Sequence, residues 1–321
     1  MNNDEMIKRI EALGIVPVVR LDRAEDAVPL AQALIAGGLP VAEITFRTEA
    51  AEESIRRVSA SFPDMLVGAG TVLTIDQVER ALGAGAKFIV TPGFNPRVVG
   101  YCVEKGIPVF PGCPTTSDIE QALELGLRVV KFFPAEQMGG LATIKAVSAP
   151  YGQMRFMPTG GVSEKNLCDY LASDRIVACG GSWMVKPELI AAGDFAAIEE
   201  LTRRAVKLML GFELRHVGVN CPDEAEALRV AQRFALLFGW QVQDGAKAAF
   251  AGEAVEAMKG PGRGTKGHIA VATNSVKRAI AYLSSMGVQV DESSVVMKGS
   301  KPVLAYLAEE IGGFAVHLVQ K

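Results

Sequence analysis

The chain has 321 residues, 49% of them apolar, and a formal net charge of -3. Its length predicts a domain of about 200 residues followed by one of about 100. The near-neutral charge argues against a polycationic nucleic-acid binder or a polybasic membrane anchor. The N-terminal segment lacks the features of a signal peptide, and no segment reaches the ~18–20 apolar residues of a membrane span. Five scattered cysteines without a CxxC pair indicate reduced thiols, so we expect a cytoplasmic protein.

Strand-like and helix-like segments alternate through the first 205 residues. The strand-like runs recur about every 20 to 25 residues, as a (β/α)8 barrel requires, and a last helix is expected over 194–210. The eight runs are 15–19, 41–46, 65–70, 87–91, 107–111, 128–133, 154–160 and 176–181. This pattern predicts an α/β fold, with a (β/α)8 TIM barrel over residues 1–210. An open, doubly wound sheet is the competing architecture, but the count of eight favours closure.

Chemically active residues cluster where these strands end. In a (β/α)8 barrel the catalytic side chains lie at the carboxyl ends of the strands. The residues at these ends are Glu43, Thr45, Arg47, Gly70, Thr71, Thr91, Pro92, Lys131, Thr159, Gly160, Gly161, Gly180, Gly181 and Ser182. Because strand side chains alternate, Glu43, Thr45 and Arg47 point the same way. If they face the barrel mouth, a carboxylate, a guanidinium and the Lys131 amine converge there.

Lys131 lies in the apolar strand RVVKFFPA (128–135). The structural alternative is a gatekeeper lysine on an edge strand, but a closed barrel has no edge. An ammonium ion is costly in an apolar strand interior. To attack a carbonyl the amine must be neutral, and lowering a lysine pKa from ~10.4 to near ~7 takes roughly 4–5 kcal/mol. Apolar walls and a neighbouring guanidinium supply much of this, so we predict that Lys131 forms a Schiff base.

Two charged residues of the second strand suit the same reaction. Glu43 is either the ion-pair partner of Arg47 or Lys131, or the group that moves protons at an imine. Arg47 suits bidentate binding of a substrate carboxylate, its alternative being a solvated loop residue. Residues 1–215 contain no histidine. This excludes a His-rich metal site and a Ser-His-Asp triad from the barrel.

Glycine pairs follow the seventh and eighth strands, as TGG (159–161) and GGS (180–182). Barrels commonly bind phosphate at this position, through backbone N–H groups and a nearby helix N-terminus. A single pair would indicate only a tight turn, whereas two pairs on adjacent strands favour a phosphate site.

Several motifs closely resemble the 2-keto-3-deoxy-6-phosphogluconate (KDPG) / 4-hydroxy-2-oxoglutarate (KHG) aldolases over roughly residues 5–205. They include GGLPVAEITFRTEAA, VGAGTVL, PVFPGCPTTSDIEQAL, KFFPAE, MPTGGV and CGGSWMV. The resemblance implies a cofactor-free class I aldolase, usually a homotrimer, that cleaves a 2-keto acid. With KDPG the products are pyruvate and glyceraldehyde 3-phosphate, and with KHG they are pyruvate and glyoxylate. A sugar-phosphate isomerase and a ligand-sensing barrel remain the alternatives.

The resemblance also implies a role for each site residue. Lys131 forms the imine, and Glu43 moves protons through a water. Arg47, Thr71 and Thr159 hold the pyruvyl carboxylate, while Pro92 and Phe133 line the pocket. Gly160 and Gly180 belong to the same glycine turns as the phosphate-binding Gly161, Gly181 and Ser182. The Cys113-Pro114 pair is a local variation in the fifth loop.

Residues 211–321 form a different predicted domain with an internal repeat. LRHVGVNCPDEAEALRVAQRFALLFGWQV (214–242) matches KGHIAVATNSVKRAIAYLSSMGVQV (266–290), and each copy reads as strand, helix, then strands. The pattern resembles the paired βαβββ modules of the glyoxalase / vicinal-oxygen-chelate superfamily. That superfamily places metal ligands on the first and last strand of each module.

By this resemblance the ligands of a divalent metal are His216, Glu256, His268 and His317. All three histidines of the chain fall in this set, and its chemistry suits Zn, Ni, Mn or Fe. His317 stands where the superfamily commonly has Glu. The alternative is a set of half-buried strand histidines in a domain used for assembly or for sensing a small molecule.

Overall fold

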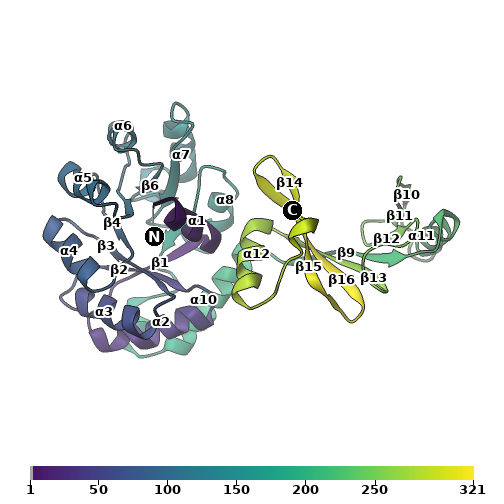
Figure 1. The fold of residues 1–321 in the computed structure, drawn as a ribbon, viewed down its shortest axis with the longest axis horizontal. Coiled ribbons are helices and arrows are strands. Elements are labelled where there is room, and N and C mark those ends of the chain that lie inside the picture. The colour runs from purple at the N-terminus through teal and green to yellow at the C-terminus, as the bar shows by residue number, and fades with distance from the viewer. Residues whose placement is uncertain (1–2) are drawn as a thin grey trace. The chain divides into compact units, whose positions relative to one another are not determined.

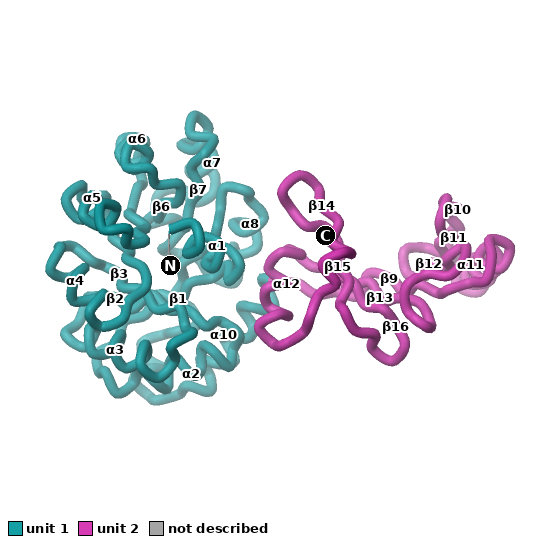
Figure 2. The backbone as a smooth tube through the Cα atoms, in the orientation of Figure 1, with its two compact units in different colours: residues 1–209 teal, residues 210–321 magenta. Residues whose placement is uncertain are grey.

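The computed structural model describes residues 3–321. The chain divides into two compact units, residues 1–209 and residues 210–321 (Figure 2). Among the described residues, no helix is long and apolar enough to cross a membrane.

Unit 1 contains a curled parallel sheet with helices around it (Figure 1). Its strands are β1 (Ile15–Val19), β2 (Val41–Thr45), β3 (Leu66–Gly70), β4 (Phe88–Val90), β5 (Val109–Phe110), β6 (Val129–Phe132), β7 (Arg155–Pro158) and β8 (Cys179–Gly181). Six strands pair in the order β5-β4-β3-β2-β1-β8, and β6 pairs with β7. Isolated parallel bridges join Gly112 to Lys131 and Thr159 to Gly180. The predicted α/β fold is confirmed, and each strand lies within its predicted segment.

The helices of unit 1 begin at residues that suit helix starts. Their bounds are α1 (Asn3–Leu13), α2 (Ala27–Ala36), α3 (Ala51–Ser61), α4 (Ile75–Gly83), α5 (Pro96–Glu104), α6 (Thr116–Glu124), α7 (Gly140–Ser148), α8 (Leu167–Leu171), α9 (Pro187–Ala191) and α10 (Phe195–Leu210). Thr74 caps α4, and Asn95 caps α5 with a proline at the first helical position. Thr115 and Asp118 form a capping box at α6. Each cap satisfies backbone N–H groups that the helix leaves unpaired.

The core of unit 1 is closely packed around the buried strands of the curled sheet. Every residue of β2 and β3 is buried, as expected for parallel strands covered on both faces. The Phe88 and Phe110 rings meet edge to face with centroids 6.0 Å apart. A Cβ at Gly68 would lie 2.2 Å from the Phe88 ring, so this strand position needs glycine.

Unit 2 is built from one eight-stranded sheet in the order β10-β11-β12-β9-β13-β16-β15-β14. Its elements are β9 (Glu213–Asn220), α11 (Glu224–Phe238), β10 (Val242–Asp244), β11 (Ala248–Ala251), β12 (Val255–Met258), β13 (Gly267–Thr273), α12 (Val276–Ser285), β14 (Val296–Lys298), β15 (Lys301–Ile311) and β16 (Phe314–Gln320). The order strand, helix, three strands therefore occurs twice, as the internal repeat predicts. β9 and β13, the first strands of the two repeats, pair antiparallel in the middle of the sheet. Within each repeat the first and last strands pair in parallel.

The helix α11 covers one face of this sheet. Ala231 of the helix packs in a buried cluster with Ala249, Ala251 and Val255 of the strands. Side chains alternate along a strand. The neighbours of these residues, among them Glu256, therefore project from the opposite face.

Candidate functional sites

A lysine and a glutamate meet inside the curled sheet of unit 1. Lys131 on β6 is 3% exposed and Glu43 on β2 is 0% exposed. The Lys131 Nζ donates to the Glu43 Oε1 at 3.2 Å, and it lies 5.3 Å from the centroid of the Phe133 ring. Each charge compensates the desolvation of the other, which a single buried ion could not achieve. The other carboxylate oxygen of Glu43 is buried without a hydrogen-bond partner, so it is free to bind a water or a substrate hydroxyl.

A cavity of about 340 Å³ opens at the carboxyl ends of the strands. Eight of the predicted site residues line it: Arg47, Phe133, Thr159, Gly160, Gly161, Gly180, Gly181 and Ser182. Thr45 also lines the cavity, and its hydroxyl donates to the Val19 carbonyl at 2.8 Å. The structure thus brings residues from β2, β6, β7 and β8 together around one space, as the strand-end pattern predicts.

The cavity carries groups suited to an anion. The Arg47 Nε donates to the Thr71 hydroxyl at 3.0 Å. Thr71 has a left-handed backbone with φ of 54°, which is costly for a β-branched residue and is typical of functional sites. The buried Thr159 hydroxyl has no partner. A guanidinium that contacts one hydroxyl group and lines the same cavity as a second is suited to binding a carboxylate.

Two glycines make room for the site side chains. A Cβ at Gly70 would lie 2.3 Å from the Glu43 Oε1, and a Cβ at Gly180 would lie 2.3 Å from the Thr159 hydroxyl oxygen. Because real Cβ atoms do not approach other atoms this closely, any larger residue would displace the carboxylate or the hydroxyl. Glycine at these strand ends therefore shapes the site.

Six of the predicted strand-end residues do not line the cavity: Glu43, Gly70, Thr71, Thr91, Pro92 and Lys131. Lys131 lies against Phe133, Glu43 against Lys131, and Thr71 against Arg47. Pro92 packs against Gly112, which forms a parallel bridge with Lys131. The contact is so close that a Cβ added at Gly112 would lie 2.1 Å from the Pro92 carbonyl oxygen. Pro92 thus supports the loop beside Lys131.

Cys113 follows Gly112 in this loop. Its backbone N–H donates to the Lys131 carbonyl at 2.8 Å, and its side chain is fully buried. Burial raises the pKa of the Cys113 thiol well above its usual range. The thiol therefore stays protonated, and the Cys113-Pro114 variation adds no second nucleophile to the site.

Arg20 was missed by the sequence analysis. It follows β1, lines the cavity, and is paired with Asp22 at 2.9 Å. The rule that singled out the other strand ends applies equally to this one, so the signal was present. Arg20 adds a second cationic group to the cavity.

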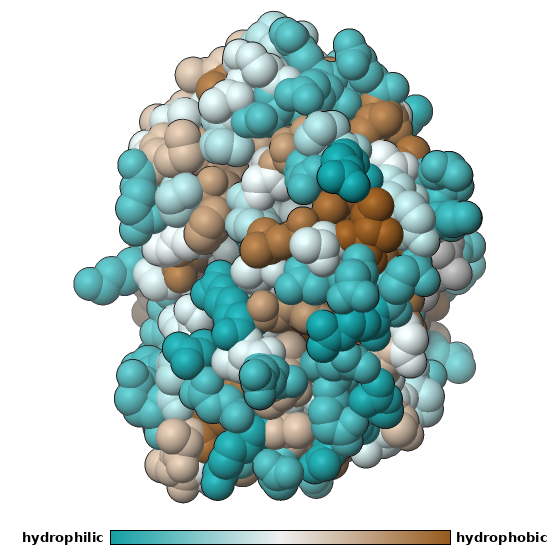
Figure 3. Space-filling view, turned by 90° about the vertical axis from the view of Figure 1, so that its left-hand side faces the viewer, coloured by the Kyte–Doolittle hydropathy of each residue, from teal (hydrophilic) through white to brown (hydrophobic). Residues whose placement is uncertain are grey.

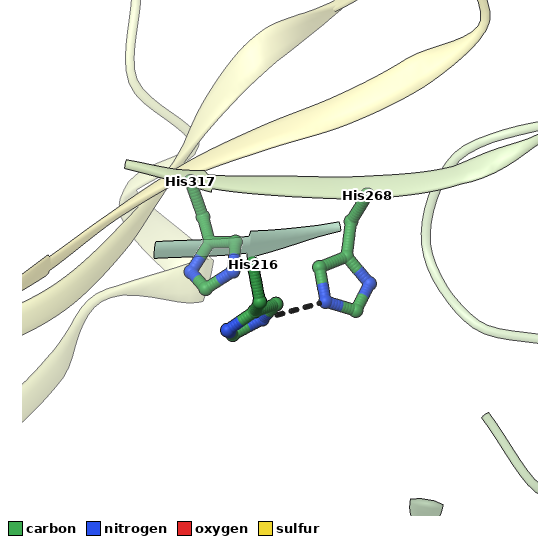
Figure 4. A group of neighbouring side chains, drawn as sticks. All are labelled: His216, His268 and His317. Carbon is green, nitrogen blue, oxygen red and sulfur yellow. Dashed lines mark hydrogen bonds between the residues drawn. The ribbon is translucent and has the colours of Figure 1, made fainter. Parts of the chain in front are cut away.

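Four ionisable side chains converge in unit 2, on the face of the sheet opposite α11. Figure 4 shows the rings of His216, His268 and His317 turned toward one another, with potential ligand atoms within 4.8 Å of one another. The Glu256 Oε2 lies 3.0 Å from the Nε2 of both His216 and His268. The first and last strands of both repeats supply this cluster, so all four predicted ligands are brought together.

His317 is the member of the cluster that indicates a ligand most clearly. It is 4% exposed, and neither of its ring nitrogens has a hydrogen-bond partner. Burial, with a smaller contribution from the two neighbouring histidines, lowers the pKa of His317 to about 4, so the ring is neutral at pH 7. The Tyr306 ring stacks on the His317 ring with the ring centroids 4.6 Å apart, and this contact holds the orientation of the imidazole. A neutral imidazole with unused nitrogens is ready to bind a metal ion.

Glu256 and His268 are also held in states that suit a ligand. Burial would raise the pKa of Glu256, but hydrogen bonds from His216 and His268 outweigh it and lower the pKa to about 2. A Cβ at Gly218 would lie 2.0 Å from the His268 ring. Glycine at this position of β9 therefore gives the ring its place.

These geometries define unit 1 as an α/β protein that presents a buried amine and a carboxylate to an anionic ligand. The chain belongs to the KDPG and KHG aldolase family, because the family model matches residues 6–201, more than half of the chain. It is 50% identical over 204 residues to the 2-dehydro-3-deoxy-phosphogluconate aldolase of Treponema pallidum (strain Nichols), covering 64% of this chain and 97% of that protein. It is 42% identical over 193 residues to the KHG/KDPG aldolase of Escherichia coli (strain K12), covering 60% of this chain and 91% of that protein.

Two solved structures are similar to unit 1. One is the KDPG aldolase of Legionella pneumophila with pyruvate captured as a covalent carbinolamine intermediate, with a TM-score of 0.60 and 37% identity. This match covers 62% of this chain and 97% of that one. The other is the 2-keto-3-deoxy-6-phosphogluconate aldolase of Zymomonas mobilis ZM4 with 3-phosphoglycerate, with a TM-score of 0.58 and 38% identity. It covers 62% of this chain and 94% of that one.

The buried ion pair yields a prediction about stability. Lys131→Met leaves the Glu43 charge buried without its partner, so the free energy of unfolding should fall by about 3–5 kcal/mol. Adding Glu43→Leu removes the second charge and should recover much of this loss, as measured by urea unfolding. A double variant less stable than both single variants would contradict the compensating role of the pair.

Proposed function

We propose that unit 1 is a class I aldolase that cleaves KDPG to pyruvate and glyceraldehyde 3-phosphate, and also cleaves KHG to pyruvate and glyoxylate. Family membership supports this proposal, as do the aldolase activities for which the relatives are named. The observation that carries it is the Lys131 Nζ, buried 3.2 Å from a carboxylate beside a cavity with an anion site. No metal or organic cofactor is needed, because a lysine imine supplies the electron sink.

The proposed mechanism uses the two buried groups in turn. Lys131 adds to C2 of the keto acid, and loss of water leaves a protonated imine. Glu43, through a water, takes the proton of the C4 hydroxyl as the C3–C4 bond breaks. The bonding electrons pass to the imine nitrogen, which forms an enamine, and the aldehyde leaves. Protonation of C3 and hydrolysis then release pyruvate and the free Lys131 amine.

The remaining site residues hold the substrate. Arg47, Thr71 and Thr159 bind the carboxylate, and Phe133 and Pro92 shape the pocket around the imine. The turns at Gly160 and Gly161 and at Gly180 and Gly181, together with Ser182, take the phosphate of the longer substrate. Backbone N–H groups at such turns suit phosphate.

Borohydride reduction with pyruvate tests the chemistry. We expect a stable adduct on Lys131, found by peptide mass spectrometry, because borohydride reduces the imine to an amine. Lys131→Arg should abolish the adduct. Lys87→Arg is the matched control, since Lys87 lies outside the candidate site and burial lowers its pKa, and it should leave the adduct intact. An adduct on another lysine, or none in the unsubstituted protein, would refute the proposal.

We further propose that the strands of unit 1 form a complete (β/α)8 barrel and that the protein is a cytoplasmic homotrimer. The bridges between β5 and β6 and between β7 and β8 support closure. Figure 3 shows apolar side chains gathered in a patch among hydrophilic ones, a pattern typical of protein contacts.

Light scattering tests the assembly. Because three chains would cover such patches at their contacts, we expect a mass three times that of the 34.1 kDa chain. A mass of one chain over the micromolar range would rule out the trimer.

For unit 2 we propose a pair of glyoxalase / vicinal-oxygen-chelate-like modules that bind a divalent metal. His216, Glu256, His268 and His317 would hold the ion, supported by the unpartnered nitrogens of His317. When bound, the metal would supply Lewis-acid chemistry to an oxygen ligand. The Phe250 ring lies edge-on to His216 with centroids 6.3 Å apart, so the site has an aromatic wall.

Metal content tests this proposal directly. After chelation and reloading with zinc, we expect about one ion per chain, and the His216→Ala, His268→Ala variant should retain none because it lacks two ligands. Gly218→Ala should also lose most of the metal, because its Cβ displaces the His268 ring. Glu253→Gln alters an exposed carboxylate outside the cluster and should bind normally, whereas Glu256→Gln should not. Equal zinc content in all variants would show that the cluster is not a metal site.

A further inference from the structure

The turn after β7 borders the candidate active-site cavity and contacts Glu136, a residue of a second cavity. Gly160 and Gly161 have consecutive left-handed backbones, with φ of 96° and 81°. On one side they line the 340 Å³ cavity of the candidate active site. On its far side Gly161 faces the Glu136 side chain. Glu136 in turn lines a second cavity of about 490 Å³, together with Leu141, Lys145, Asn166, Asp169, Tyr170 and Ala172. Two adjacent glycines have wide conformational freedom, so contacts on this far side must fix the position of the turn.

Glu136 supplies two of these contacts, and the Ala135 N–H supplies another by donating to the Thr159 carbonyl at 2.8 Å. The Glu136 backbone N–H donates to the Gly160 carbonyl at 3.1 Å. The Cβ and Cγ of Glu136 fill the space behind Gly161. A Cβ added at Gly161 would lie 2.5 Å from them. The Asn166 amide adds a bond to the Gly161 carbonyl at 3.3 Å. The Gly161 half of the turn therefore rests on the Glu136 side chain, and the Gly160 half on the Glu136 backbone.

Tyr170 in turn fixes Glu136. The Tyr170 hydroxyl donates to the Glu136 Oε1, and the tyrosine is 1% exposed. Burial raises the pKa of Tyr170 far above the physiological range, so the hydroxyl keeps its proton and remains a donor. Glu136 is itself exposed to solvent, and without this bond its side chain would be free to leave the turn. Neither residue lines the active-site cavity.

We propose that Glu136 and Tyr170 are positioning residues that hold the Gly160–Gly161 turn and thereby set the preference for a phosphorylated substrate tail. This inference rests on the proposed function, in which that turn binds the phosphate. A phosphate site made of backbone N–H groups works only while those groups stay within about 0.5 Å of their bound positions. The reacting carbon lies at Lys131 on β6, so a looser turn affects the tail and leaves the chemistry unchanged.

The experiment compares two substrates in Glu136→Ala and Tyr170→Phe. We expect the KM for KDPG to rise about 5- to 10-fold, the effect of one lost hydrogen bond. The KM for KHG, which has no phosphate, and the kcat for both substrates should stay within about twofold. Inorganic phosphate, used as a competitive inhibitor of KHG cleavage, should bind the variants about 5- to 10-fold more weakly.

Three further variants separate positioning from a general structural effect. Glu136→Gln keeps an acceptor for the Tyr170 hydroxyl and should behave like the unsubstituted protein. The double variant should be no worse than the weaker-binding single variant, because both changes break one contact. Tyr151→Phe is the matched control: the Tyr151 hydroxyl donates to Glu120 at 2.8 Å in a similar pair elsewhere in unit 1, and its loss should alter neither KM.

Equal changes for both substrates, or no change in the KM for KDPG and in phosphate inhibition, would overturn the positioning role. The pyruvate adduct on Lys131 reports on the proposed function separately. If the unsubstituted protein forms the adduct and cleaves KDPG but the variants show no selective change, only this inference fails. If the unsubstituted protein forms no adduct, both fail.

Discussion

A buried ammonium and a buried carboxylate, 3.2 Å apart, impose the main constraint on unit 1. Lys131 is on β6 and Glu43 is on β2. A bridge places β6 next to β5, so the strands β5, β4 and β3 lie between them. Neighbouring strands are about 4.8 Å apart, so a flat sheet would separate β6 from β2 by roughly 19 Å. Contact between the two side chains is possible only because the sheet curls. The ion pair and the curvature therefore depend on each other.

Close packing between neighbouring strands explains the glycines beside the functional side chains. Gly70 lies against the Glu43 carboxylate, and Gly180 lies against the Thr159 hydroxyl. In unit 2 the same relation holds between Gly218 and the His268 ring. At each place a functional side chain from one strand occupies the volume that a neighbouring side chain would need. Close packing thus selects glycine on the strand next to the reactive group.

Much of unit 1 could be predicted from the sequence, because its signals are local. The eight strands are short apolar runs, and Lys131 is distinctive as a charge inside one of them. Arg20 was overlooked although it follows β1, since an arginine after a strand is common on protein surfaces. The Glu136–Tyr170 bond could not be predicted, because it joins residues 34 positions apart and depends on how α8 lies behind the turn.

In unit 2 the superfamily resemblance predicts four ligand candidates that lie close together in the structure, but it gives no indication of what surrounds them. Tyr306 stacks on His317 from β15, whose pairing with β16 shifts register between Tyr306 and Glu310. A register shift breaks the two-residue alternation on which strand patterns rely. Which face of the sheet a side chain on such a strand points to can therefore be determined only from the three-dimensional structure.

The antiparallel pairing of β9 with β13 has a consequence for how the histidine cluster comes into being. Each repeat holds two of the four side chains, His216 and Glu256 in the first and His268 and His317 in the second. Neither repeat alone can present more than half of the set. The cluster is complete only when the two halves are joined along β9 and β13. A single repeat, cut from the chain, could rebuild a four-membered set only by pairing with another copy of itself.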